Sequence, residues 1–185
     1  MRKNFGAKPY LYPMPVLIIG SYDENNTPNA MNAAWGCIAD MNRIGIYITN
    51  NHKTTANILA RKAFTVSIAD AAHVTEADYV GIVSANDIPD KLTKAGLHTT
   101  KSEFVDAPLI NEFPMALECK LISFDEDSEL LVGEIVNVCA DESILTDGKI
   151  DPQKLNPITY DPVNHDYLTL GVKVGNAFED GKKLK

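Results

Sequence analysis

The hydrophobic positions in the first third of the chain follow the short periods of β-strands. Aliphatic and β-branched residues dominate 15–22, and a turn-rich Asp-Glu-Asn-Asn sequence ends that run. Small residues fill 29–39, which we expect to form a second strand and a hairpin with the first. In 44–49, isoleucine occupies every second position and therefore marks one face of a third strand.

The period then changes to that of a helix. Apolar positions recur at helical spacing over 54–62, where either of two adjacent threonines can begin the helix. Residues 63–69 return to the pattern of a strand. Residues 75–83 open with a capping-type Thr-Glu-Ala-Asp sequence and predict a second helix. A third, short helix is predicted over 88–95, because a proline opens it and a glycine follows it.

The last part of the chain predicts a long hairpin and then mostly irregular structure. Residues 115–124 and 130–138 read as strands joined by the acidic turn 125–128. Three prolines in 151–162 favour a loop. We expect 167–178 to form a last strand or an extended arm. Short strands with few helices favour an antiparallel Greek-key β-barrel with helical insertions over a parallel doubly wound sheet.

Composition and charge narrow the function classes. The chain has 185 residues, of which 45% are hydrophobic and 23% are charged, as in ordinary globular proteins. With 17 basic and 25 acidic residues, the net charge of −8 is a poor match to nucleic acid or to an anionic membrane. No run approaches the roughly 18 apolar residues of a membrane span. We therefore expect a soluble, cytoplasmic protein.

The cysteines and histidines point to no metal centre and no disulfide. Cys37, Cys119 and Cys139 are odd in number and widely spaced, and each lies among apolar or strand-like residues. We expect three buried free thiols. The four histidines show no metal-binding spacing, and the common nucleotide and hydrolase motifs are missing from the sequence.

One polar stretch, 48–58, joins the end of a strand to the start of a helix. A helix N-terminus presents free backbone N–H groups and a partial positive charge, which suit a phosphate. His52, Lys53, Thr54 and Thr55 add donors and positive charge to it. The alternative is that Thr54 or Thr55 simply caps the helix, and these residues alone favour it.

Two further places are ambiguous. The small residues of 29–36 would allow a flat ligand to lie against the strand backbone, or would pack tightly against a helix or a second subunit. Lys91, near a helix start, is the second ambiguous place and a candidate site residue. Composition alone favours a solvated surface lysine there.

A series of motifs runs through nearly the whole chain. In chain order they are Pro-Val-Leu-Ile (15–18), Asn-Ala-Met-Asn-Ala-Ala-Trp (29–35), Lys-Thr-Thr-Ala-Asn-Ile (53–58), Phe-Thr-Val-Ser (64–67), Gly-Ile-Val-Ser-Ala (81–85), Asp-Lys-Leu-Thr-Lys-Ala-Gly-Leu (90–97), Ala-Pro-Leu-Ile (107–110), Leu-Glu-Cys (117–119), and Leu-Gly with Gly-Asn-Ala-Phe (170–178). Their order and spacing resemble the flavin reductase-like family, and specifically its flavoredoxin-type branch.

The resemblance implies a single, mainly β domain over 1–185, an antiparallel Greek-key split β-barrel with a C-terminal extended arm. It also implies a homodimer that binds FMN noncovalently at its interface. The site residues that it implies are Asn32, Ala33, Ala34 and Trp35 beside the isoalloxazine, Asn50, His52, Lys53, Thr54 and Thr55 at the ribityl-phosphate end, and Ser84, Ala85 and Lys91 to complete the site.

The sequence departs from the family at three positions. Asn32 stands where Thr or Ser is usual, Ala85 replaces a glycine, and Leu92 replaces a phenylalanine. These departures bear on ring contacts and reactivity. Cys119 matches the family, but its place in an alternating strand predicts core packing, so we assign it no catalytic role.

Three functions follow from the resemblance. The first is an NAD(P)H-dependent flavin reductase, in which hydride passes from NADH or NADPH to FMN and electrons pass onward. The second is a flavoredoxin-like electron carrier that a redox protein reduces, and the acidic surface would suit a basic partner. The third is a barrel that keeps the dimer but binds no cofactor. Because a flavin performs the electron chemistry itself, the first two need no protein nucleophile. An oligonucleotide-binding barrel is disfavoured, because no basic stretch is interleaved with aromatic residues.

Overall fold

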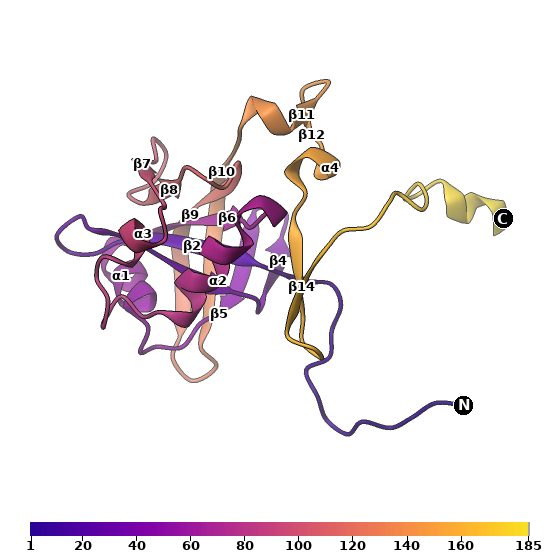
Figure 1. Cartoon of the computed structure of the whole chain (residues 1–185), viewed down its shortest axis with the longest axis horizontal. Helices are drawn as coiled ribbons and strands as arrows, with labels where there is room; N and C mark the ends of the chain where they lie inside the picture. The colour runs from indigo at the N-terminus through magenta and orange to yellow at the C-terminus, as the bar shows by residue number, and fades with distance from the viewer. Residues whose placement is uncertain (185) are drawn as a thin grey trace.

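A curled antiparallel sheet of seven strands forms the body of the computed structural model, which describes residues 1–184 (Figure 1). The strand order is β3-β2-β6-β9-β10-β5-β4. These strands are β2 (Leu17–Tyr22), β3 (Pro28–Ala33), β4 (Gly36–Asp40), β5 (Arg43–Tyr47), β6 (Ala63–Ile68), β9 (Met115–Asp125) and β10 (Leu130–Ala140). The predicted antiparallel, mainly β barrel architecture is confirmed.

The strand predicted over 29–39 is wrong as a single element. It is two strands, β3 and β4, which lie at opposite edges of the sheet and are joined only by Ala34 and Trp35. The chain therefore steps across the open side of the curled sheet at this point. Gly36 permits the step, because a Cβ there would lie 2.7 Å from Cδ1 of Leu17.

The helices do not share one face of the sheet: Ile58 packs inside the curled sheet, whereas Ala77 and Val80 pack on its other face. The helices are α1 (Lys53–Arg61), α2 (Val74–Ile82), α3 (Lys91–Lys94) and α4 (Pro152–Leu155), with the 3-10 turns η1 (Ala71–His73), η2 (Glu142–Ile144) and η3 (Asp180–Leu184). The first three helices and the long β9–β10 hairpin occupy the places that the sequence pattern predicts. No helix in the described part of the chain is long and apolar enough to cross a membrane.

The remaining strands are short. They are β1 (Met14–Pro15), β7 (Thr99–Lys101), β8 (Pro108–Ile110), β11 (Leu145–Thr146), β12 (Lys149–Ile150), β13 (Ile158–Asp161) and β14 (Asp166–Thr169). The loop predicted over 151–162 is wrong, because this segment holds both α4 and β13. Pro152 stands at the start of α4, where proline is favoured, and Asp151 caps that helix by accepting from the backbone N–H of Gln153.

Strand β2 is buried on both faces, which explains its unbroken apolar run. Leu17 and Ile19 pack inside the curled sheet with Phe64, whereas Ile18 packs on the other face against Val80 of α2. A strand buried on both faces loses the alternation of a half-exposed strand. The two hydrophobic clusters thus lie on either side of one central strand.

The prediction that all three cysteines are buried is wrong for two of them. Cys119 is buried in β9, but Cys139 is only half-buried and Cys37 is exposed. Cys37 lies on β4, the last strand of the sheet, with no further strand beside it among residues 1–184. All three are free thiols.

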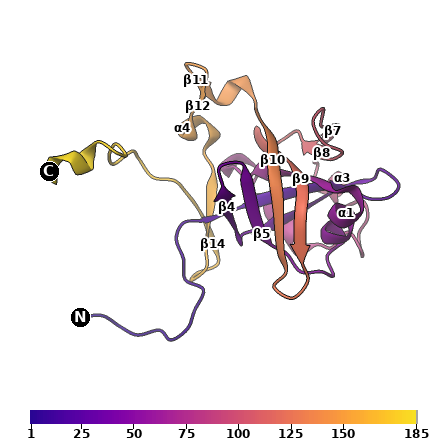
Figure 2. The ribbon, with the colours of Figure 1, turned by 180° about the vertical axis from the view of Figure 1, so that it is seen from behind.

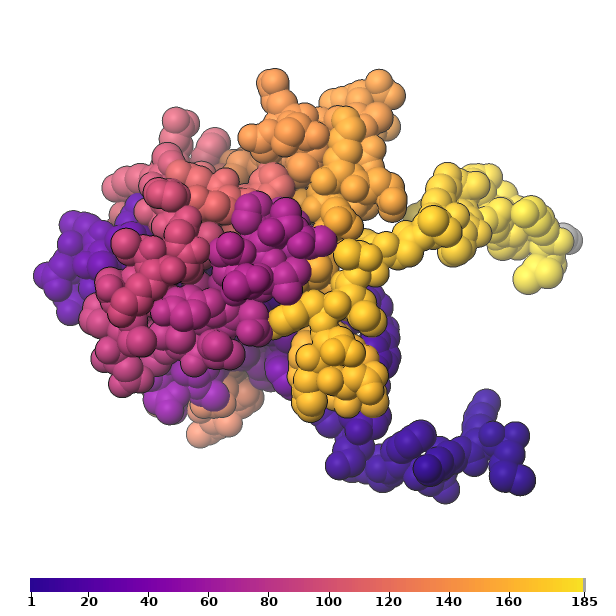
Figure 3. Space-filling view, viewed as in Figure 1, coloured from indigo at the N-terminus to yellow at the C-terminus, as the bar shows by residue number. Residues whose placement is uncertain are grey.

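Both ends of the chain leave the body on the same side (Figures 1 and 3). The N-terminal segment leads into β1, which pairs with β13, and β13 pairs in turn with β14. Beyond Thr169 the chain continues as an extended arm that ends in η3. A short strand followed by an arm agrees with the pattern of 167–178.

Candidate functional site

A trough runs along β3 between the start of α1 and the end of α2. Its narrower part is a cavity of about 200 Å³, and its wider part, beside β5 and the β9–β10 turn, is a cavity of about 390 Å³. Met31, Asn32 and His52 line both parts, so the two are continuous. We call this feature the β3 trough. Its size is typical of small-molecule sites.

The start of α1 leaves backbone donors free at the narrow part. His52 is the N-cap, yet its side chain makes no capping hydrogen bond within the described chain. The first helical bond runs from the N–H of Ala56 to the carbonyl of His52. Because Lys53, Thr54 and Thr55 form the first turn, the alternative in which a threonine caps the helix is wrong. This turn carries no acidic residue, so its partial positive charge is not compensated locally.

Thr54 and Asn29 form a buried polar pair beside these donors. The Nδ2 of Asn29 donates to Oγ1 of Thr54 at 2.7 Å, which leaves the threonine hydroxyl hydrogen available. Oδ1 of Asn29 is buried and has no hydrogen-bond partner within residues 1–184. Both side chains line the narrow cavity. Buried polar atoms are almost always satisfied, so this orphaned acceptor beside a cavity points to a ligand.

Lys91 closes the C-terminal end of α2. Its Nζ donates to the carbonyls of Val80 and Val83 at 3.1 and 2.9 Å, and the residue is only 3% exposed. The interpretation of Lys91 as a solvated surface lysine is therefore wrong. Desolvation lowers the pKa of Lys91 to about 8, so the ammonium stays mostly charged at neutral pH. It fixes the segment that carries Ser84 and Ala85 into the trough.

Helix α2 approaches β3 closely at one point. The Nδ2 of Asn32 donates to the carbonyl of Ala77 at 3.0 Å. A Cβ on Gly81 would lie 2.9 Å from Cβ of Asn32, so only glycine fits there without displacing β3. The trough wall thus depends on Gly81.

Most of the predicted site residues meet in the β3 trough. Those that line it are Asn32, Ala33, Ala34, Trp35, His52, Lys53, Thr54, Ser84, Ala85 and Lys91. Thr55 does not line it, because it is buried and its hydroxyl donates to the carbonyl of Thr49 at 2.7 Å. Asn50 is exposed, and its N–H donates to Oε1 of Glu129 at 3.2 Å.

Sequence reasoning missed several residues that line the trough, among them Asn29, Gly81 and Tyr47. Asn29 and Gly81 lie inside quoted motifs, but neither spacing nor periodicity distinguishes them from their neighbours. Tyr47 also lines the wider part and is half-exposed. A polar asparagine inside a strand of small residues is the one signal that could have marked Asn29.

The chain matches one protein-family model, the flavin reductase like domain, over residues 10–160. The chain belongs to the flavin reductase-like family. This confirms the resemblance drawn from the ordered motifs.

Solved structures of the flavin reductase-like fold agree. The flavoredoxin of Desulfovibrio vulgaris (Miyazaki F) is 40% identical, with a TM-score of 0.94 over 98% of this chain and 100% of that one. A flavoredoxin from Methanosarcina acetivorans is 26% identical, with a TM-score of 0.91 over all of both chains. An FMN-binding domain of a flavin reductase-like enzyme from Shewanella baltica OS155 is 20% identical, with a TM-score of 0.79 over 88% of each chain, and shows the same fold.

The departures from the flavin reductase-like pattern fall in different places. Asn32 and Ala85 line the trough. Leu92 is buried in the hydrophobic cluster between the sheet and α2, away from the trough lining. Cys119 is fully buried in the other cluster, and burial raises the pKa of its thiol to about 12. Its prediction as a core residue is confirmed.

Proposed function

We propose that the protein is an FMN-binding electron-transfer flavoprotein, with the cofactor in the β3 trough. One observation carries the proposal: the trough runs from the free N–H groups of α1 to the small residues of β3. The first end suits a phosphate, because helix donors and Lys53 lie together there. Ala33 and Ala34 leave room for a flat ring at the other end.

The residues present fit FMN in polarity as well as in shape. Thr54 has a hydroxyl hydrogen to donate, and Oδ1 of Asn29 can accept from a ligand hydroxyl. His52 and Ser84 add polar groups between the two ends. FMN, when bound, supplies the electron chemistry. The protein would hold the phosphate, orient the ring against β3, and limit the access of water.

Between the two redox roles, we favour a flavoredoxin-type electron carrier. The support is likeness to a flavoredoxin at 40% identity over nearly the whole of both chains. The net charge of −8 suits docking to a basic redox protein. A reductase that takes hydride from NADH or NADPH is the second candidate, because the wider part of the trough offers about 390 Å³ beside Trp35 and Tyr47.

The test is a visible absorption spectrum of the purified protein before and after addition of FMN. A bound-flavin spectrum is expected. NADH and then NADPH are added anaerobically to the same sample. Under the carrier proposal the flavin absorbance persists, and a reduced redox protein is needed to bleach it. Bleaching by either nucleotide would establish the reductase instead and name its donor. Failure to retain FMN after reconstitution would overturn both roles and leave a barrel without a cofactor.

A further inference from the structure

A cavity of about 680 Å³, separate from the β3 trough, lies at the C-terminal end of α1. Its walls are the start of β6, the loop that joins β7 to β8, and β9, and we call it the β7–β8 cavity. It shares no lining residue with the trough, and the length of α1, about 13 Å, separates the two. Figures 1 and 2 both show α1, β7 and β8 on the side of the molecule away from the two chain ends. A molecule bound in this cavity would therefore leave the trough open.

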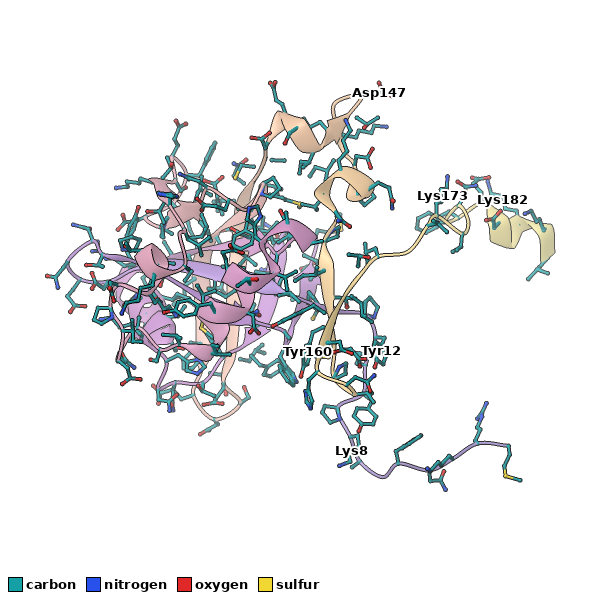
Figure 4. The ribbon with its side chains drawn as sticks, in the orientation of Figure 1. Lys8, Tyr12, Asp147, Tyr160, Lys173 and Lys182 are labelled. Atoms are coloured by element: carbon teal, nitrogen blue, oxygen red, sulfur yellow. The ribbon has the colours of Figure 1, made fainter. Side chains whose placement is uncertain are left out.

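The lining of the β7–β8 cavity is basic, although the chain as a whole is acidic. Four cationic and two acidic side chains line it, which gives a local charge of +2 in a protein of net charge −8. They are Arg61, Lys62, Lys101, Lys120, Glu103 and Asp106. Figure 4 shows Lys8, Lys173 and Lys182, near the chain ends, far from this side of the molecule, so they do not contribute to the local charge. A basic cavity of this kind attracts an anion.

Contacts within the fold account for only some of these charges. The carboxylate of Asp106 accepts from Nη1 of Arg61 at 3.1 Å and lies 3.4 Å from Nζ of Lys101. Lys62 and Lys120, by contrast, have no carboxylate within 4 Å of Nζ among residues 1–184. The charges of these two lysines therefore have no structural partner.

The two unpaired lysines leave neighbouring points of the backbone. The N–H of Leu121 donates to the carbonyl of Lys62 at 2.9 Å, and Ala63 pairs with Lys120 between β6 and β9. Both lysine side chains line the cavity and are exposed. Glu134, the cross-strand neighbour of Lys120 on β10, does not line the cavity. Two adjacent ammonium groups without a carboxylate are well placed to hold one phosphate.

Phe104 adds an aromatic surface to the same cavity. It is 56% exposed, and the loop that carries it is anchored. The N–H groups of Phe104 and Val105 donate to Oγ of Ser102 at 3.0 and 2.9 Å, and the Ser102 hydroxyl donates to the buried carboxylate of Glu118. The loop thus holds Phe104 at the surface before any ligand arrives. An aromatic side chain on an ordered loop can stack on a flat ring at a small cost in entropy.

We propose that the β7–β8 cavity binds a nucleoside phosphate, with the phosphate between Lys62 and Lys120 and the base against Phe104. Glu103, which also forms no ion pair within the described chain, can accept from the ribose hydroxyls. The volume lies within the roughly 300–1,000 Å³ that is typical of small-molecule sites. This site is independent of the proposed function, because it shares no residue with the trough.

A titration of the FMN-loaded protein with ADP, followed by the shifts of its backbone amide resonances, tests the proposal. The trough is then already occupied. ADP should bind saturably with a dissociation constant below about 0.1 mM and shift the amides of 61–63, 101–106 and 120. Inorganic diphosphate and adenosine should each bind at least about tenfold more weakly, since each makes only part of the contacts.

Three results would overturn the proposal. They are the absence of saturable ADP binding, shifts that lie outside the β7–β8 cavity, and diphosphate binding as tight as that of ADP, which would exclude a contact to the base. Binding of a glutamate-rich peptide without binding of ADP would overturn it in favour of an acidic protein partner. If the protein retains no FMN, the same titration without FMN still tests this site, so the failure of the proposed function is distinguishable from the failure of this one.

Substitutions separate the two halves of the site. Lys62→Ala with Lys120→Ala should weaken the binding of both ADP and diphosphate at least about tenfold, because both phosphate contacts are lost. Phe104→Ala should weaken ADP binding about tenfold and leave diphosphate binding unchanged. Lys149→Ala with Lys173→Ala is the matched control, because it removes the same charge from exposed positions outside the cavity. An equal loss in the control variant, or normal ADP binding without Lys62 and Lys120, would contradict the proposed site.

Discussion

The helix ends of this molecule are of two kinds. At the C-terminal end of α1, Arg61 pairs with Asp106 at 3.1 Å and donates to Oδ1 of Asn26 at 2.8 Å, while Lys62 adopts a left-handed conformation and closes the helix. The C-terminal end of α2 is closed by Lys91. The N-terminal end of α1 has free donors and no acidic neighbour in its first turn. The chain thus closes these two C-terminal ends with side chains or a left-handed residue, and it leaves the start of α1 open towards the trough.

Of the substitutions that test this contrast, Arg61→Ala should change the free energy of unfolding most. Arg61 also donates to the carbonyl of Asp23, so its removal breaks several bonds in a half-buried setting. We expect the free energy of unfolding to fall by about 3 kcal/mol, measured by urea denaturation. FMN affinity should stay within about threefold in the folded protein. A large loss of affinity would show that the two ends of α1 are not independent.

The second prediction concerns pH and Lys91. Its pKa is about 8 in the folded protein against 10.5 for a free lysine, so the unfolded state binds more protons between these values. Stability should therefore rise as the pH increases from about 8 to 10.5, by about 2.5 kcal/mol. Denaturation at a series of pH values measures the rise. The Lys91→Met variant should lack it, and an equal rise in that variant would exclude Lys91 as the source.

At the open end, Lys53→Ala should lower FMN affinity without lowering stability. Lys53 lies 3.6 Å from the exposed Glu24, a weak ion pair whose loss changes stability by less than about 0.5 kcal/mol. Loss of one charge near the phosphate should raise the FMN dissociation constant about tenfold, or roughly 1.4 kcal/mol. Fluorescence titration with FMN measures this change. Lys120→Ala, at an exposed position on β9, is the matched control and should bind FMN normally.

The smallest predicted effect is that of His52→Asp, which should raise the stability of the protein and lower its affinity for FMN. An aspartate in place of His52 would accept hydrogen bonds from the free N–H groups of α1 and place a negative charge beside them. His52→Asp should raise stability by about 0.5 to 1 kcal/mol while it weakens FMN binding. His52→Ala supplies no acceptor and should give no such gain in thermal denaturation. If His52→Asp stabilised the protein and bound FMN normally, the phosphate would lie elsewhere.

Local patterns predicted the helices and strands of this fold better than they predicted which of these elements lie side by side. The run at 16–19 and the helical spacing over 54–62 are properties of short segments, and both elements form where expected. The strand over 29–39 failed, because its division at Ala34 and Trp35 depends on how the sheet curls, which no local period encodes. Lys91 was misread for a similar reason. Its burial depends on the carbonyls of Val80 and Val83 at the C-terminal end of α2, which lie 11 and eight residues earlier in the sequence.

Residue types alone predicted the candidate site less well than they predicted the fold. They identified a helix start that suits phosphate, but they left capping and binding as alternatives. The ordered motifs added the ring side and the residues near Ser84. Asn29 and Gly81 were missed. Asn29 matters because its buried Oδ1 has no hydrogen-bond partner in the described chain, and Gly81 matters because the absence of a Cβ lets α2 approach β3. Both properties arise only when β3 meets α1 and α2.

The two-residue link between β3 and β4 has a consequence for cooperativity. Ala34 and Trp35 are the only covalent bridge between the two edges of the sheet at this point, and both line the trough. A molecule bound in the trough would contact the link between the two edge strands. Its binding free energy would therefore oppose the opening of β3 and β4 together. Amide protons of β3 and β4 should thus exchange with solvent as one unit and slow together when the trough is filled. Ligand binding at this site would then stabilise the two edge strands of the sheet against local unfolding.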